Sequence, residues 1–420
     1  MNFKLIFCYF LAIIAYKITF LGVLDMLIEF KVKNFRSIQD QQTFSLVAGP
    51  GMELEQNTCA AGGDLELKVI RAAVIYGPNA GGKSNLLAAL LALKNWVLLS
   101  AKESQQGETI PVEGFAYDKK AHKAPSEFEL SFIVDNVRYQ YGFVADKNIV
   151  FEEWLFAYPS GRVQQWFSRV YNEKNKKYSW KFSKLFKIDK KIADRTRPNV
   201  LFLSKAVDDN SEQLFPIFSW FKENLICIGP ANKTLTEPKN TIDYIKNKDK
   251  KRVLEFLKVA DPSIVDIFVE KETENLLKSK INLVHSEGVL LNLVDESDGT
   301  QRLLKFAATW LEALDKGAVL IADEINNSLH PLLVKFLINL IYDPRNNKKN
   351  PQLIFTTHDT ALLDNELFRR DQVWFVEKNK NHATQLYSLL DFSPRKQDAI
   401  GKNYLQGRYG ALPYIGTWGF

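Results

Sequence analysis

Residues 77–84 read GPNAGGKS and match the pattern G-x-x-x-x-G-K-[ST] at every fixed position. The run VIRAAVIY (69–76) precedes them and is typical of a buried strand, while NLLAALLALKNWVLL (85–99) follows with leucines at helical spacing. A strand, a glycine-rich loop and a helix in this order predict a loop whose backbone N–H groups face phosphate oxygens. An ordinary turn between a strand and a helix is the alternative interpretation.

The residues of this loop predict a site for ATP and Mg²⁺. Lys83 adds a full positive charge, and the hydroxyl of Ser84 is a suitable ligand for Mg²⁺. The predicted nucleotide-binding residues of this segment are Gly77, Pro78, Asn79, Ala80, Gly81, Gly82, Lys83, Ser84 and Asn85.

The composition of the chain is that of a soluble globular protein, with 420 residues, 46% hydrophobic and 25% charged. The net charge of +6 permits nucleic acid as a partner without demanding it. Three widely spaced cysteines form no C-x-x-C pair, which argues against a disulfide scaffold or a zinc site and favours the cytoplasm.

The first 25 residues are apolar from Leu5 to Tyr16 and are then interrupted by Lys17. They lack a small-residue cleavage site and are short for a membrane span. The favoured interpretation is an over-extended start or a dispensable extension, with Met26 opening the first strand. A membrane anchor is the alternative, and we do not expect membrane association.

The remaining chain alternates between two kinds of pattern. Period-two alternation predicts strands in 26–46 and an antiparallel meander in 111–158, and helical spacing follows in 208–275. We expect an α/β ATPase core with a mixed sheet, an antiparallel β-lobe and an inserted helical lid. The predicted parts are an N-terminal extension (1–25), the first core segment with the phosphate loop (26–110), the β-lobe (111–200), a helical insertion (201–275) and the second core segment (276–420).

Residues 161–200 carry twelve lysines and arginines against three acids. Aromatic residues are interleaved with this charge: Trp166, Phe167, Tyr171, Tyr178, Trp180, Phe182 and Phe186. Basic charge beside rings suits a nucleic-acid groove. A hairpin with a solvated lysine face and a buried aromatic face is the favoured interpretation.

Two further apolar runs predict the second half of the site. AVLIADE (318–324) ends in two acids, of which Asp323 is expected to hold Mg²⁺ through water and Glu324 to deprotonate the attacking water. PQLIFTTHD (351–359) ends near His358, which is placed to sense the γ-phosphate. The alternative for Asp323 and Glu324 is a core strand that happens to end in two acids. The alternative for His358 is a purely structural histidine.

A second anion site is predicted in ESDGTQRLLKFAATWLEAL (296–314), where a small polar loop opens a helix. Ser297, Gly299 and the helix N-terminus would form it. One phosphate loop and one separate anion loop in a single chain suggest two copies packed head to tail, each completing the other's site. We therefore expect a homodimer or a larger homo-oligomer.

The motifs taken together resemble those of ABC-type ATPases of the SMC, RecF and Rad50 kind, and more closely the compact branch related to OLD ATPases and to abortive-infection ATPases of phage-defence operons. The resemblance covers about residues 26–416. Its motifs are KNFRSI (33–38), GPNAGGKS (77–84), ESDGTQRL (296–303), LIADEINNSLHP (320–331) and FTTHD (355–359), supported by DQVWFVEK (371–378) and YLQGRYGALP (404–413).

The resemblance implies roles for individual residues. Arg36 would lie near the nucleotide, Lys83 would bind β and γ oxygens, and His358 would be the switch histidine. Ser297 and Gly299 would cap the γ-phosphate held by the opposite protomer. The loop residues implied at the dimer interface are Asn327, Ser328 and His330.

Three departures from the family pattern qualify this resemblance. Asp298 stands where a small residue is expected in the second anion loop. The family has a lid glutamine that usually bonds the Mg²⁺ or the attacking water, and Gln105 and Gln106 are the only candidates for it in this sequence. Neither a zinc-hook C-x-x-C nor a coiled-coil arm is present, which argues against a chromosome machine, and we expect no appended nuclease domain.

The leading hypothesis is an ATP-hydrolysing switch or sensor of a prokaryotic anti-phage system, acting with a separate effector such as a nuclease. A RecF- or Rad50-like DNA-binding repair protein is the alternative. A transporter subunit, suggested by residues 1–25, is disfavoured.

Overall fold

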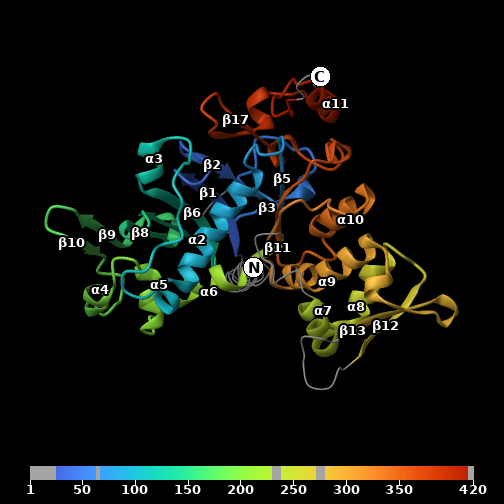
Figure 1. Cartoon of the computed structure of the whole chain (residues 1–420), viewed down its shortest axis with the longest axis horizontal. Helices are drawn as coiled ribbons and strands as arrows, with labels where there is room; N and C mark the ends of the chain where they lie inside the picture. Colours follow the sequence, from blue (N-terminus) through green and yellow to red (C-terminus); the bar gives the residue numbers. More distant parts are fainter. Residues whose placement is uncertain (1–24, 63–66, 229–237, 271–279, 415–420) are drawn as a thin grey trace, which may run out of the picture.

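The computed structural model of the protein describes residues 25–62, 67–228, 238–270 and 280–414. The predictions for residues 1–24 lie outside these ranges. Figure 1 shows a lobe of antiparallel strands on one side of a central sheet, and a smaller unit of helices and strands on its other side.

The central sheet has six strands in the order β11-β15-β16-β5-β17-β18. All neighbours are parallel except β17 and β18. The strands are β11 (Leu225–Ile228), β15 (Val319–Ala322), β16 (Gln352–Thr356), β5 (Ala72–Tyr76), β17 (Val373–Lys378) and β18 (Thr384–Ser388). Because the carboxyl ends of parallel strands share one edge, the residues that follow β5, β15 and β16 meet there.

The antiparallel lobe is a seven-stranded sheet in the order β10-β9-β8-β7-β6-β1-β2. Its strands are β10 (Lys177–Phe182), β9 (Gln164–Asn172), β8 (Val150–Tyr158), β7 (Val137–Ala145), β6 (Ser126–Val134), β1 (Met26–Lys33) and β2 (Gln42–Ser45). Alternate residues of β6, such as Phe128 and Leu130, are fully buried. The predicted first strand at Met26 and the predicted antiparallel meander are confirmed.

Helix α2 (Lys83–Glu103) packs between the two large sheets (Figure 1). Its leucines join one apolar cluster with Phe30 of β1 and with Ala73 and Ile75 of β5. Alternate residues of β5 face the opposite cluster, which includes helices α9 (Asp298–Lys316) and α10 (Pro331–Tyr342). Within the described residues α2 is the one helix long and apolar enough to cross a membrane, and its place between the sheets explains that composition.

The other described elements surround this core. Helices α5 (Phe202–Asp208) and α6 (Phe215–Glu223) contact α2, and α8 (Lys250–Lys258) contacts α9. The remaining elements are a small sheet of β12 (Ile264–Glu270), β13 (Lys280–His285) and β14 (Leu290–Asn292), a ribbon of β3 (Thr58–Ala60) and β4 (Lys68–Ile70), and helices α3 (Lys119–Lys123), α4 (Lys191–Arg195), α7 (Pro238–Tyr244) and α11 (Ile400–Leu405). The predicted helical insertion therefore contains helices, but the core strand β11 interrupts it. The predicted domain boundaries stay predictions.

The aromatic side chains of the basic segment 161–200 pack on one another. The Trp180 ring stacks on Phe182 at 5.6 Å and meets Phe202 of α5 edge to face at 4.9 Å, and Trp166 stacks on Phe186 at 5.7 Å. Trp166 and Phe186 are buried and Trp180 and Phe182 are half-buried, while the lysines of β10 are exposed. The arrangement agrees with the hairpin interpretation of this segment.

Candidate functional site

The phosphate loop runs from the end of β5 to the start of α2 as the sequence predicts. Gly77 and Gly82 have positive φ values of 155° and 116°. A Cβ atom on Gly77 would lie 2.2 Å from the backbone oxygen of Val376, and one on Gly82 would lie 2.1 Å from Oγ1 of Thr384. Both glycines are therefore required, because β17 and β18 press directly against the loop.

Lys83 is buried, with 6% of its surface exposed, and its ammonium folds back over the loop. Nζ donates to the carbonyl oxygens of Gly77 at 2.8 Å and Pro78 at 3.1 Å. Burial lowers the pKa of Lys83 to about 8, although the negative charges of Asp323 and Glu324 act in the opposite direction. A cation held in this way lacks hydration, so an anion that enters the loop gains a strong partner.

Asp323 and Glu324 follow β15 directly, and Thr356 at the end of the neighbouring strand β16 contacts both. The Thr356 hydroxyl donates to Oδ1 of Asp323 at 2.6 Å and accepts the Glu324 backbone N–H at 2.8 Å. The Glu324 backbone has a φ of 50°, which is uncommon for a residue other than glycine. Sequence reasoning gave Thr356 no role, because the sequence does not show that β16 lies next to β15.

His358 lies two residues beyond β16 at the same edge of the sheet. Loss of hydration around the ring and then the positive charge of Lys83 lower its pKa, while Glu324 and Asp323 oppose this. The imidazole is therefore neutral at neutral pH. The predicted groups from β5, β15 and β16 thus share one electrostatic environment.

Ser84 and Asp323 offer the oxygen donors that Mg²⁺ prefers. Ser84 is exposed in the first turn of α2, and Oδ2 of Asp323 has no hydrogen bond to any described residue. This donor set fits the predicted cation.

The second anion loop and the loop after Glu324 lie together. Ser297 caps α9, with Oγ accepting the Thr300 backbone N–H at 3.1 Å, and a Cβ atom on Gly299 would lie 3.3 Å from the backbone oxygen of Ser328. Ser297, Asn327 and Ser328 are exposed, as is His330, so these loops are accessible to another molecule.

Arg36 lies in a turn whose next residue, Ser37, contacts the start of α2, and its place near the nucleotide stays a prediction. Asn85 of α2 donates to Oγ of Ser37 at 2.7 Å, and Arg36 pairs with Glu113 at 3.5 Å. These residues line a cavity of about 480 Å³. Tyr117 lines it as well, with Nζ of Lys378 at 5.2 Å from its ring centroid. Sequence reasoning missed this cavity, because its walls come from distant segments.

The two glutamine candidates for the lid are wrong. Gln105 and Gln106 follow the carboxyl end of α2, whose 21 residues begin at Lys83. A helix of that length places them about 30 Å from the phosphate loop.

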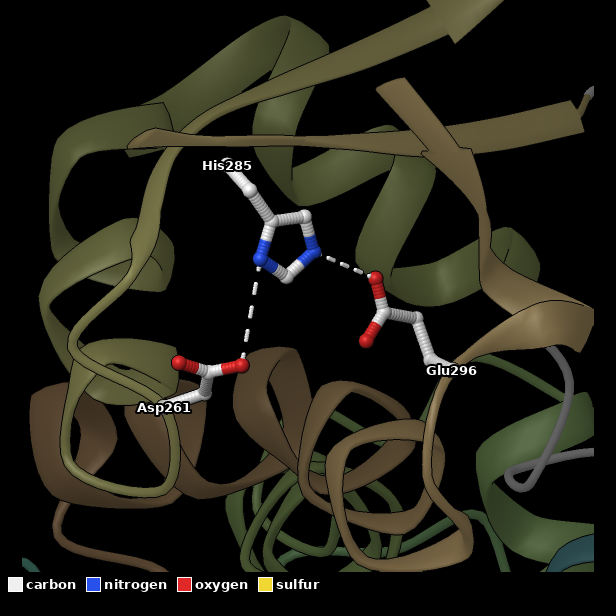
Figure 2. A group of neighbouring side chains, drawn as sticks. All are labelled: Asp261, His285 and Glu296. Carbon is white, nitrogen blue, oxygen red and sulfur yellow. Dashed lines mark hydrogen bonds and ion pairs between the residues drawn. The ribbon is translucent and has the colours of Figure 1, made fainter. Parts of the chain in front are cut away.

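A further polar cluster joins Asp261, His285 and Glu296, the residue before Ser297. Figure 2 shows the His285 imidazole between the two carboxylates, with Nε2 at 2.7 Å from Oε1 of Glu296 and Nδ1 at 3.9 Å from Oδ2 of Asp261. Nδ1 also lies 2.7 Å from Oγ of Ser263. The three side chains could hold a metal ion, and their hydrogen bonds tie β13 to the second anion loop.

A family model described as "AAA domain, putative AbiEii toxin, Type IV TA system" matches residues 72–364. This span begins at β5 and contains the phosphate loop, both acids and His358. No curated protein matches the chain.

Three solved structures are similar to this chain. The SMC head domain from Thermotoga maritima has 14% identity and a TM-score of 0.38, and the match covers 86% of this chain and 98% of that one. The SMC head bound to the C-terminal winged-helix domain of ScpA has 14% identity and a TM-score of 0.44, with 86% and 97% covered. The SMC head with an extended coiled coil, bound to the C-terminal domain of ScpA derived from Pyrococcus furiosus, has 13% identity and a TM-score of 0.41, with 88% and 98% covered.

Proposed function

This chain belongs to the AAA-domain family whose model it matches, and on that premise we propose that it binds ATP with Mg²⁺ and hydrolyses it to ADP and phosphate. One observation carries the proposal. Lys83 of the phosphate loop, the acids Asp323 and Glu324 and the neutral His358 meet at the carboxyl edge of the parallel strands of the central sheet.

Each group has a task in this reaction. The N–H groups of the loop bind the phosphates, and the Lys83 ammonium exchanges its two carbonyl partners for phosphate oxygens. Ser84, and Asp323 through a water, would hold Mg²⁺, which would neutralise charge on the phosphates. Glu324 accepts a proton from the attacking water, and His358 hydrogen-bonds the γ-phosphate.

The cavity beside Arg36 is the proposed place for the nucleoside end of ATP. It adjoins the first turn of α2 through Asn85, and it offers the cations Arg36 and Lys378 and the exposed side chain of Tyr117, whose ring stacks on His382 at 4.9 Å. Positive charge beside an aromatic side chain suits a base and the phosphate nearest to it.

A second copy of the chain is the proposed partner at the exposed loops. Ser297 and Gly299 lie beside Ser328 in one protomer, so one surface presents both loops to a partner. A head-to-tail dimer would bring Ser297 to the γ-phosphate bound by the other protomer, and both sites would then be shared.

The proposed biological role is the switch of a cytoplasmic anti-phage, abortive-infection module that controls a separate effector. The family description names a putative toxin of a toxin–antitoxin system, and this supports a role in a module of more than one component.

The test is a pull-down of tagged Glu324→Gln, expressed from Met26 together with its neighbouring genes. A stoichiometric second protein, identified by mass spectrometry, is expected. Recovery of nucleic acid without a protein partner would contradict the switch and favour the DNA-binding alternative.

The exposed lysines of β10 are the observation that favours this alternative, a RecF-like DNA-binding protein. Because the aromatic rings of residues 161–200 already pack on one another, such binding would depend mainly on phosphate contacts and would weaken steeply with salt. Filter binding of duplex DNA at several salt concentrations, with and without ATP, tests this. Absence of binding would exclude it.

A further inference from the structure

The Thr356 side chain contacts both the Asp323 carboxylate and the Glu324 backbone. Thr356 is fully buried at the end of β16, which pairs in parallel with β15. Asp323 and Glu324 directly follow β15, so the register of the two strands brings the hydroxyl between them.

The hydrogen bonds of this hydroxyl have only one consistent direction. The carboxylate of Asp323 can only accept, so the Thr356 O–H donates to Oδ1 at 2.6 Å. The Thr356 oxygen then accepts the N–H of Glu324 at 2.8 Å. Oδ1 of Asp323 is thereby engaged, and Oδ2 is the oxygen left for a cation.

The backbone of Thr356 also holds the strained segment. Its carbonyl oxygen accepts the N–H of Ile325 at 3.2 Å, so Glu324, with a φ of 50°, is fixed on both sides by one residue. A left-handed backbone at a non-glycine residue persists only where its surroundings enforce it. Thr356 therefore controls the carboxylate orientation of Asp323 and the backbone of Glu324 together.

We propose that Thr356 is the positioning residue of the ATPase site, and that its hydroxyl sets the affinity for the Mg²⁺ that accompanies the nucleotide. The inference rests on the proposed ATP binding. It adds that cation binding depends on a side chain that touches neither the cation nor the nucleotide.

The experiment compares Thr356→Val, which keeps the shape and removes the hydroxyl, with Thr356→Ser, which keeps the hydroxyl. The matched control is Thr357→Val. The neighbouring Thr357 is equally buried and also donates one hydrogen bond and accepts one, but to Asn326 and from Asp359. Binding of a fluorescent, non-hydrolysable ATP analogue is titrated with Mg²⁺ and in excess chelator, and thermal melting is followed in parallel.

We expect Thr356→Val to reduce the Mg²⁺-dependent gain in nucleotide affinity about 10- to 100-fold, as is typical when a residue behind a metal ligand is removed. Nucleotide affinity in chelator should be unchanged. Thr356→Ser should keep the wild-type Mg²⁺ response. Thr357→Val should have a lower melting temperature than the wild-type protein but also keep the Mg²⁺ response. If Thr356→Val does not fold, Thr356→Ala removes the same hydroxyl and should give the same loss.

A wild-type Mg²⁺ response in a folded Thr356→Val or Thr356→Ala protein would overturn the inference while leaving the proposed function intact. Loss of the response in Thr357→Val as well would also overturn it, since a merely structural role would then suffice. Absence of nucleotide binding by the wild-type protein would instead refute the proposed function, and the inference with it.

Discussion

Replacing Lys83 with methionine is expected to change how the stability of the nucleotide-free protein depends on pH. The pKa of Lys83 is lowered from 10.5 to about 8 by burial. Below pH 8 the folded protein carries a poorly hydrated ammonium, which costs stability. As the pH rises towards 10.5 the folded state releases this proton before the unfolded state does, so stability rises across this window.

The size of the effect follows from the same pKa. A fall from 10.5 to about 8 corresponds to about 3 kcal/mol, at ~1.36 kcal/mol for each pH unit. Lys83→Met has no proton to release at this position. The free energy of unfolding of the wild-type protein, relative to that of Lys83→Met, should therefore increase by about 3 kcal/mol between neutral pH and pH 10.5.

The assay is urea denaturation of both proteins at a series of pH values in nucleotide-free buffer. Lys83→Arg serves as a second reference, because a guanidinium keeps its charge over the whole range. Parallel curves for the wild-type protein and Lys83→Met would refute the reasoning. Such a result would mean that Lys83 is hydrated or that its carbonyl partners fully offset the burial.

Two further outcomes are expected. Arg169→Met should lower the free energy of unfolding by about 3–5 kcal/mol, because Glu153, whose carboxylate lies 2.8 Å from the Arg169 guanidinium, would remain fully buried without its counter-charge. Lys181→Ala, on the exposed face of β10, should change the free energy of unfolding by less than about 0.5 kcal/mol. Urea denaturation measures both, and similar values for the two variants would contradict the buried pair. Mixing inactive Lys83→Ala with inactive Ser297→Arg should restore ATP hydrolysis, because a head-to-tail dimer of the two keeps one intact site. No recovery at any mixing ratio would argue against shared sites.

The phosphate loop could be predicted from the sequence because its chemistry is local. Eight consecutive residues between a strand and a helix contain Lys83 and Ser84, and no distant contact is needed to recognise them. The same holds for Asp323, Glu324 and His358, which follow apolar strands and whose meeting at one edge follows from parallel pairing alone.

The features that were missed depend on contacts between distant segments. Thr356 gains its role only because β16 lies next to β15, and the sequences of these two strands do not predict that they are neighbours. Strand β11 has four residues between helices, too few for a pattern to distinguish it from its surroundings. Gln105 and Gln106 are wrong candidates for another reason, because the full length of α2 separates them from the phosphate loop.

The most direct test of the central claim compares ATP binding and phosphate release for the wild-type protein and Glu324→Gln, both expressed from Met26. Glu324→Gln is expected to bind ATP with Mg²⁺ as tightly as the wild-type protein, because the phosphate loop and Asp323 are unchanged. Its rate of phosphate release should fall at least about 100-fold, as the loss of a general base requires. Hydrolysis at the wild-type rate by Glu324→Gln would contradict the claim that Glu324 is the general base. Failure of the wild-type protein to bind ATP would contradict the proposed ATPase function.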